Sequence, residues 1–494
     1  MSRSYDEERE KYTQCFPTDT EGGGTSWSAA RKEELRTAPL ISLDVKYHVE
    51  DKQGETLFPQ YALLGRHVGN LEYVSSEEPI LMNTNAPSST FICGSQGSGK
   101  SYTLSCMLEN CLRKDDVLGK LVRPLTGVVF HYDRNGAGAV AEAASLCSTG
   151  VKVRVLVSRS WYHQLAASYS TVPGATEKNM EVLPLLFQDH HLEADRILKL
   201  MALSGSDNAM PLYMDVLLRI LRDTAVNGKR LTLADLDRQL DEQNFTPSQR
   251  VMLEMRMGLL RSFCASWAKQ ALADAQARVP GKANKDRLAR TQPPIPEQDL
   301  FALQPGTLTI IDLTDPFVDA STACVLFDMC LGLITAGKHL EGSGGLVIAL
   351  DEAHKFLNKT PAADEFTEQI LTDSDDDPHA AALRGESVGG HAGAHNLRAP
   401  AGSVLHHLGG ASALTTSPGE QQAMFERIMG LPVGESLVFS PSSYVSIRDG
   451  EPGKLGAGVM RVKTRMRKGG DAGRSVLSMR SKKGDSEDSE SSSE

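Results

Sequence analysis

The sequence predicts an α/β fold built around a mainly parallel sheet flanked by helices, with an all-helical insertion and disordered termini. Short apolar runs alternate with segments of helical periodicity, which is typical of a parallel sheet covered on both faces. A glycine-rich loop joins one apolar run to a helix, and two carboxylates directly follow another apolar run. Because parallel strands end at the same edge of a sheet, we expect these polar groups to lie together.

The composition is that of a globular protein. With 494 residues, 40% of them hydrophobic, the chain can bury two or three domains. A net charge of −11 argues against an overall nucleic-acid-binding surface, although a local basic face stays open. The 8 cysteines show no CxxC pair or metal-ligand spacing, so we expect neither zinc nor disulfides. The sequence shows no signal peptide and no apolar run of about 18 residues. We therefore expect an intracellular protein, cytoplasmic or nuclear, that has no membrane partner.

The first part of the core is expected within residues 40–160. Before it, residues 1–38 are charged and Gly/Ser-rich, which predicts a disordered arm. Apolar runs predict strands at 90–93, 125–133 and 151–157, and a helix follows the glycine-rich loop after the first of them.

Residues 161–300 are expected to be a helical insertion followed by a linker. Between 178 and 275 the apolar residues recur at helical spacing, so we expect this block to be all helix. Thr232 and Thr246 each start a capping-box pattern, the second with proline at the first helical position.

The core is expected to resume at residues 301–465. Apolar runs predict strands at 307–313 and 345–350, separated by a helix over 320–336. The acidic, serine-rich end predicts a disordered tail over 466–494.

The glycine-rich loop GSQGSGKS at 94–101 matches the Walker A pattern GxxxxGK[ST] between a strand and a helix. Its glycines let backbone N–H groups point at phosphate oxygens at the positive end of the helix dipole. Lys100 would contact the β and γ phosphates, and the Ser101 hydroxyl would bind Mg²⁺. The alternative is a glycine-rich turn with a chance lysine. The residues expected to bind nucleotide are Gly94, Gly97, Ser98, Gly99, Lys100 and Ser101.

A second pair of candidate residues follows the apolar run LVIAL. Asp351 and Glu352 stand where a Walker B strand delivers carboxylates to the ligand edge of the sheet. Asp351 would hold the Mg²⁺ shell, and Glu352 would act as general base on the attacking water. The expected catalytic residues are Glu352 and Lys100. The expected cofactors are ATP and Mg²⁺. The alternative is that Asp-Glu is only a solvated helix start.

Three other nucleotide-binding classes lack support. The letters DEAH match a helicase group, but its SAT-like and arginine motifs are missing. Guanine specificity would require NKxD, whereas Asn358-Lys359 continues Thr360-Pro361. An ABC transporter would carry LSGGQ shortly before the Asp-Glu pair, and Leu203-Ser204-Gly205 lies too far upstream.

The arrangement resembles the HerA/FtsK-type P-loop ATPases, in the version that occurs in fungi. The similar text is TFICGSQGSGKSYTLSCMLENCL, TLTIIDLTDPF, VIALDEAHKFL, LHHLGGAS and LPVGESLVFSP, and the resemblance covers about 60–160 and 300–465. It implies a recombinase-like ATPase core, usually a homo-oligomer and often a motor acting on DNA. We therefore expect an ATP-hydrolysing motor or remodeller; a nucleotide-binding scaffold without productive hydrolysis is the alternative.

One stretch departs from that family. There the strand after the Asp-Glu strand ends in text like ATQEPTIS, whose glutamine senses the γ-phosphate, whereas here 386–402 read ESVGGHAGAHNLRAPAG. Codons for 390–397 can be chosen so that dropping the first base restores ATQEPTIS, and the same shift upstream gives RVSV. We interpret 373–402 as an out-of-frame translation, from a sequencing error or a misplaced splice junction; a natural low-complexity loop is the alternative.

This interpretation carries structural expectations. Residues 373–402 should be an exposed, irregular segment, with a gap or a substitute strand between the strands at 90–93 and 346–350. Without the sensor glutamine we expect weak or no turnover, because losing one transition-state hydrogen bond costs about 10² to 10³ in rate.

Two smaller sets of polar residues lie in or near predicted strands. In a strand, Arg461, Lys463, Arg465 and Arg467 would share one face, as a phosphate contact or as a solvated face. His131 and Asp133 end the second strand near the expected pocket, and we assign them no role.

Overall fold

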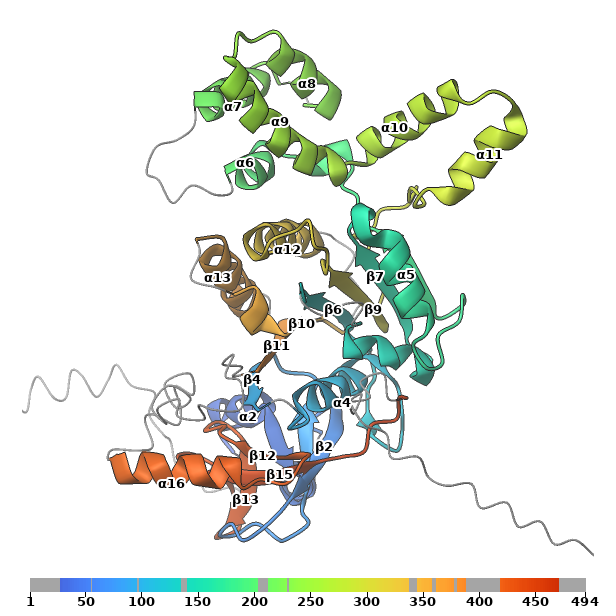
Figure 1. Cartoon of the computed structure of the whole chain (residues 1–494). Helices are drawn as coiled ribbons and strands as arrows, with labels where there is room; N and C mark the ends of the chain where they lie inside the picture. Colours follow the sequence, from blue (N-terminus) through green and yellow to red (C-terminus); the bar gives the residue numbers. More distant parts are fainter. Residues whose placement is uncertain are drawn as a thin grey trace, which may run out of the picture.

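The computed structural model contains two sheets joined through one helix (Figure 1). It describes residues 27–54, 56–95, 97–134, 140–202, 212–228, 231–336, 344–357, 361–376, 380–387 and 418–470.

The first sheet has seven strands, and every neighbouring pair is parallel. In spatial order they are β4 (Ser89–Gly94), β11 (Ala380–Ser387), β10 (Leu346–Asp351), β6 (Thr126–His131), β9 (Thr307–Asp312), β7 (Lys152–Val157) and β8 (Met180–Pro184). All seven carboxyl ends therefore meet at one edge. The predicted fold class, a parallel sheet flanked by helices, is confirmed.

Helices cover both faces of this sheet (Figure 1). On one face lie α4 (Lys100–Leu112) and α5 (Tyr162–Ser170), which pack with buried strand residues such as Val129 and Ile310. On the other lie α12 (Ala320–Thr335) and α13 (Pro361–Asp376), which pack with Phe130 and Ile311. Successive strand residues point to opposite faces of the sheet. These apolar strands are buried on both sides and therefore contribute side chains to two separate cores.

The second sheet combines the two ends of the described chain. Its strands, in spatial order, are β12 (Glu435–Val438), β15 (Met460–Thr464), β2 (Tyr61–His67), β3 (Pro79–Asn83), β1 (Leu40–Ser42), β13 (Tyr444–Arg448) and β14 (Glu451–Lys454), with β5 (Gly119–Lys120) paired to β2. Residues 40–160 were predicted to be the first part of one core; in the structure the strands within 40–83, which are β1, β2 and β3, lie in this second sheet. Leu64 and Val462 of this sheet share a core with Leu108 of α4, so α4 lies between the two sheets.

The N-terminal arm predicted over 1–38 is shorter than expected. Helix α2 (Ala29–Arg36) begins at Ser28, whose hydroxyl accepts from Arg31 N at 3.2 Å. Leu35 is fully buried beside Tyr444, so the prediction of disorder is wrong for 29–38. Composition misled because Leu35 belongs to a core that also takes in residues distant in sequence, such as Leu81 and Tyr444. Helix α3 (Leu43–Gln53) covers the same core.

The insertion is largely helical, as predicted. It contains α6 (Ala194–Ala202), α7 (Leu212–Val226), α8 (Leu233–Asp241), α9 (Pro247–Ser262), α10 (Ala265–Arg278) and α11 (Lys282–Thr291). Thr232 and Thr246 cap α8 and α9 as expected, accepting from the backbone of Asp235 and Gln249. The prediction that 178–275 are all helix is wrong at β8, where pairing with β7 decides the local structure.

Short 3₁₀ helices occupy several connections: η1 (Glu142–Thr149), η2 (Arg159–Trp161), η3 (Asp189–His191) and η5 (Ala353–Lys355). Helix α16 (Pro418–Met429) precedes β12. None of the helices in the described part of the chain combines the length and hydropathy of a membrane-spanning segment.

Strand β11 lies within residues 373–402, the segment that was predicted to be irregular. It lies between β4 and β10, with Leu383 level with Thr90 on one side and Ala349 on the other. The predicted irregular segment is therefore wrong at the end of α13 and over β11; the remainder, 377–379 and 388–402, lies outside the described residues. The strand supplies backbone partners to the inner edges of β4 and β10, which a gap would leave unpaired. The strand between β4 and β10 is thus formed by residues of the same segment that was expected to be irregular.

Candidate functional site

The glycine-rich loop forms a tight turn between β4 and α4. Gly97 and Gly99 adopt φ of 79° and 100°, a region that residues with a Cβ rarely enter. At Gly94, a Cβ would lie 2.7 Å from the Ser98 hydroxyl oxygen. Ser98 N donates to Ser95 O at 3.2 Å and closes the turn. Local sterics therefore explain why these positions are glycine. The concave backbone that the glycines create fits a phosphate group.

Lys100 begins α4 at the mouth of this loop. Its Nζ donates to Ser95 O at 3.0 Å. Burial lowers the pKa of Lys100, and the carboxylates of Glu352 and Asp351 oppose that shift. The predicted residues of the two motifs thus lie within electrostatic reach of one another. Ser101 follows in the first turn of α4 and is half-buried.

Asp351 ends β10 and faces His131, a residue to which the sequence pattern assigned no role. The two residues are level in the β10–β6 register, and His131 Nδ1 lies 3.3 Å from Asp351 Oδ2. Both side chains are less than a tenth exposed. Burial by itself would lower the pKa of His131, but Asp312 and Asp351 outweigh it and raise the pKa to about 9. The neighbouring carboxylates thus favour the protonated form of His131.

Glu352 has an uncommon backbone conformation. Its φ of 55° and ψ of 36° place a non-glycine residue in the left-handed region. Its carboxylate Oε2 lies 3.5 Å from Lys355 Nζ and 3.5 Å from His354 Nδ1. Lys355 Nζ also lies 2.8 Å from Asp133 Oδ2. Lys355 thus joins the carboxylates that follow β10 and β6.

The neighbouring strand β9 contributes a fully buried carboxylate, Asp312. Its Oδ2 accepts from the Tyr169 hydroxyl at 2.7 Å, and its Oδ1 accepts from Thr314 N at 2.9 Å. The carboxyl edge of the sheet therefore carries acids on three adjacent strands. Neither Asp312 nor Lys355 was predicted from the sequence; the available signals were an acid at the end of a third apolar strand and a lysine three residues after Glu352.

The second sheet also reaches the glycine-rich loop. Gly434 N donates to Ser98 O at 3.4 Å, just before β12. The Thr103 and Thr464 hydroxyls lie 3.3 Å apart. A side chain added at Gly99 would point at Gly434, because its Cβ would lie 3.6 Å from Gly434 N. The loop is thus held from both sheets.

The basic residues near the end of the second sheet do not form one solvated face. Arg465 is buried and pairs with Glu109 at 2.8 Å. The other two arginines also pair with carboxylates, Arg461 with Glu435 and Arg467 with Glu142, whereas Lys463 is exposed. The prediction that the four would share a face fails because the chain leaves β15 after Thr464 and packs on α4.

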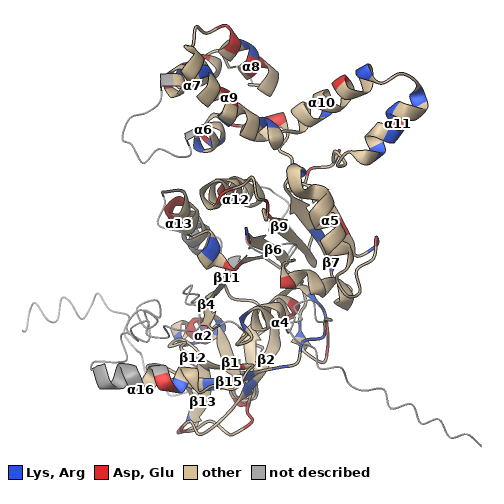
Figure 2. Ribbon diagram, viewed as in Figure 1, with Lys and Arg blue, Asp and Glu red and all other residues tan. Residues whose placement is uncertain are grey.

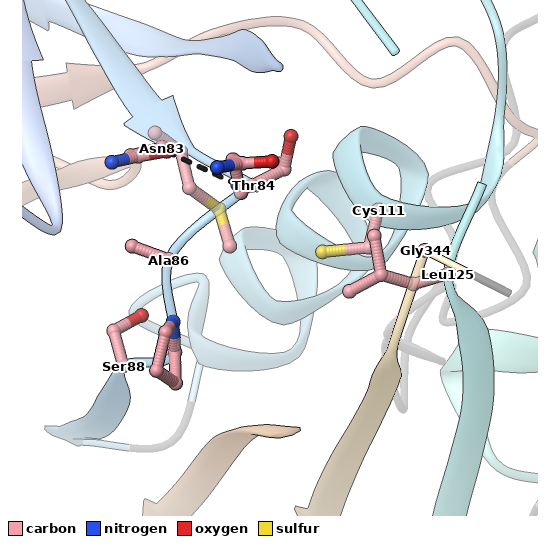
Figure 3. A pocket seen from close by; sticks show the side chains of 10 residues that line it. Asn83, Thr84, Ala86, Ser88, Cys111, Leu125 and Gly344 are labelled. Carbon is pink, nitrogen blue, oxygen red and sulfur yellow. Dashed lines mark hydrogen bonds between the residues drawn. The ribbon is translucent and has the colours of Figure 1, made fainter. Parts of the chain in front are cut away.

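The cavity shown in Figure 3 lies at the opposite end of α4 from the glycine-rich loop. Its lining includes Asn83, Ala86, Cys111 and Leu125, at the amino ends of the parallel strands. Its volume of about 10 Å³ is close to the room needed for one water molecule. A nucleotide would not fit in this cavity, which lies away from the two motifs at the carboxyl edge.

No protein-family model matches the sequence, and neither does any curated protein. Among solved structures, that of VirB4 of Thermoanaerobacter pseudethanolicus is similar, with a TM-score of 0.41 and 12% identity over 83% of this chain and 97% of that one. A likeness at this level assigns no function.

Proposed function

We propose that the chain is a P-loop NTPase that binds ATP with Mg²⁺ and hydrolyses it to ADP and phosphate. The observation that carries this proposal is the pairing of two motifs at one sheet edge. The glycine-rich loop follows β4, and the carboxylates of Asp351 and Glu352 lie at the end of β10; both strands pair in parallel with β11, so the two motifs lie at the same edge of the sheet. A turn that only connects two elements has no need of these carboxylates.

Each residue has a role that its chemistry suits. The N–H groups of the loop, from Gly94 to Ser101, would hold the phosphates, and Lys100 would neutralise charge on the β and γ groups. Ser101 and Asp351 supply the oxygen ligands that Mg²⁺ prefers, and the bound metal would neutralise charge that develops on the phosphate oxygens. Glu352 would accept a proton from the attacking water.

A nucleotide-binding scaffold without efficient hydrolysis is the second candidate, and two observations favour it. The Glu352 carboxylate lies beside two basic side chains, Lys355 and His354. Their N–H groups compete with the attacking water for the carboxylate oxygens. Strand β11 reads AAALRGES, so the strand between β4 and β10 has no glutamine that could sense the γ-phosphate. We therefore expect slow turnover rather than none.

The test compares nucleotide binding with phosphate release in the full chain. Lys100→Ala should lose ATP binding, whereas Glu352→Gln should keep binding and lose turnover by at least about 10². Lys114→Ala is the matched control, because Lys114 is exposed just beyond the far end of α4. Equal phosphate release from Glu352→Gln and the unmodified chain would remove the hydrolase assignment. ATP binding without turnover would support the scaffold.

The resemblance to HerA/FtsK-type ATPases extends the proposal to a homo-oligomeric motor that acts on DNA. The formal charge of −11 gives the whole molecule no general affinity for nucleic acid, so a motor needs a local basic surface. Stimulation of phosphate release by DNA, together with the molecular mass in solution, tests this extension.

A further inference from the structure

Helices α10 and α11 form a hairpin that projects away from both sheets (Figure 1). A short turn at Val279–Gly281 joins them, with Gly281 at φ of 85°. Only Ala265 and Ala268, at the base of α10, are buried, and α11 has no buried residue. The hairpin therefore adds little to either core, and its presence needs another explanation.

The hairpin is basic although the protein is acidic. Figure 2 shows Lys and Arg along α11 and at the adjoining end of α10. Residues 265–292 hold six basic and two acidic residues, a local charge of +4 against −11 for the chain. Five of the six are exposed and Lys285 is half-buried. The six are Lys269, Arg278, Lys282, Lys285, Arg287 and Arg290.

Several arginines elsewhere in the insertion pair with carboxylates. Arg238 pairs with Asp235 at 2.6 Å, and Arg250 pairs with Asp241 at 3.1 Å. Arg261, at the base of the hairpin, pairs with Asp237 and Glu254, both at 2.8 Å. Within the described part of the chain, no carboxylate pairs with any of the six hairpin cations.

Unpaired cations crowded on a thin projection repel one another, so an arrangement of this kind gains stability from an anionic partner. A protein partner would require an apolar centre on the surface, and protein interfaces are rich in aromatic anchors and poor in lysine at their core. The one aromatic residue of the hairpin, Trp267, lies at its base, under the Arg261 guanidinium at 4.9 Å. Evenly spread charge without apolar anchors suits a phosphate backbone instead.

We propose that the α10–α11 hairpin is a nucleic-acid-binding arm that contacts the sugar–phosphate backbone without reading sequence. This inference rests on the proposed function in one respect, since it names the substrate class on which the ATPase would act. Binding itself needs no hydrolysis. Helix α11 has ten residues, or about 15 Å of length, enough to follow several phosphates of one strand.

The experiment measures binding of a mixed-sequence DNA duplex to the full chain by fluorescence anisotropy, across a salt series. The variant carries Lys282→Gln, Lys285→Gln, Arg287→Gln and Arg290→Gln. The matched control carries Lys114→Gln, Lys120→Gln, Lys152→Gln and Lys178→Gln, four exposed lysines elsewhere on the molecule. ATP binding and DNA-independent phosphate release are measured on all three proteins.

We expect the hairpin variant to bind DNA at least roughly tenfold more weakly, and the dependence of log affinity on log salt to flatten by about 0.9 for each lost phosphate contact. The control should bind like the unmodified chain, and ATP binding should be the same in all three. An equal loss in the hairpin variant and the control would overturn the proposal, and so would unchanged binding in the hairpin variant.

Two further outcomes separate this inference from the proposed function. Hairpin-dependent DNA binding without ATP turnover would uphold the arm and reject the hydrolase. ATP turnover with no DNA binding, or hairpin-dependent binding to vesicles of anionic lipid in place of DNA, would overturn the arm and leave the hydrolase standing.

Discussion

Arg465 and Glu109 form an ion pair in the interior, with Nη1 2.8 Å from Oε2 and side chains 5% and 1% exposed. Arg465 follows the second sheet and also donates to Leu63 O at 2.9 Å and Asn110 Oδ1 at 2.9 Å. Glu109 also accepts from Lys468 N at 3.0 Å. This network fastens the second sheet to α4, the helix that begins at the glycine-rich loop.

We expect Arg465→Ala to lower the free energy of unfolding by about 3–5 kcal/mol, because Glu109 is left as a buried charge without a cation. Urea denaturation measures the effect. Lys463→Ala is the control, since this exposed lysine should change stability by less than about 0.5 kcal/mol. Similar changes in the two variants would show that the pair does not stabilise the contact between sheet and helix.

The left-handed backbone of Glu352 leads to a second prediction. A Cβ in this conformation costs about 1–2 kcal/mol, so Glu352→Gly should be more stable than Glu352→Ala by about 1 kcal/mol. Both variants should lose phosphate release, because both lack the carboxylate. Thermal denaturation and turnover on the same preparations provide the comparison.

Glu365 is the matched site for that experiment. It is exposed within α13, where glycine is less stable than alanine by roughly 0.5–1 kcal/mol. The order of the two substitutions should therefore reverse between positions 352 and 365. If alanine is the more stable residue at both, Glu352 is not held in a left-handed conformation in solution.

His191 predicts a pH dependence of stability. Its Nδ1 accepts from Gln188 N at 3.2 Å, and burial, with a smaller effect of His190, lowers the pKa of His191 to about 4. An unfolded histidine protonates near pH 6.5, so between pH 6.5 and 4 the unfolded state binds the extra proton. Stability should fall as the pH drops through this window, by about 1–3 kcal/mol.

The comparison uses His191→Gln, which should be less sensitive to pH between 6.5 and 4. His190→Gln is the control, because His190 is adjacent in sequence but exposed. Unfolding free energies are measured at several pH values for each protein. Parallel pH profiles for the unmodified chain and His191→Gln would mean that His191 is protonated in the folded state.

Strand β11 can be tested without a substitution. Its position between β4 and β10 predicts that the amides of 380–387 exchange with solvent as slowly as those of β10. Hydrogen exchange read by mass spectrometry resolves the two segments. Complete exchange of 380–387 at the earliest times, with β10 protected, would restore the interpretation of this region as an irregular segment.

Local features were predictable because their causes are local. The glycine-rich loop could be identified from residues 94–101 alone, because positive φ angles and steric clearance depend on residues that are neighbours in sequence. The caps at Thr232 and Thr246 each depend on a residue three positions away. Apolar runs at β6, β9 and β10 were long enough to identify buried parallel strands.

The sequence by itself thus determined the fold class, the glycine-rich loop and the Asp351-Glu352 pair. Only the tertiary structure decided which distant segments share a sheet: residues 40–83 with 435–464, and β11 between β4 and β10. It also decided that His131 faces Asp351, 220 positions away, and that Arg465 is buried against Glu109. The reason is that strand pairing and the burial of charge depend on partners remote in sequence, and local propensity carries no record of those partners.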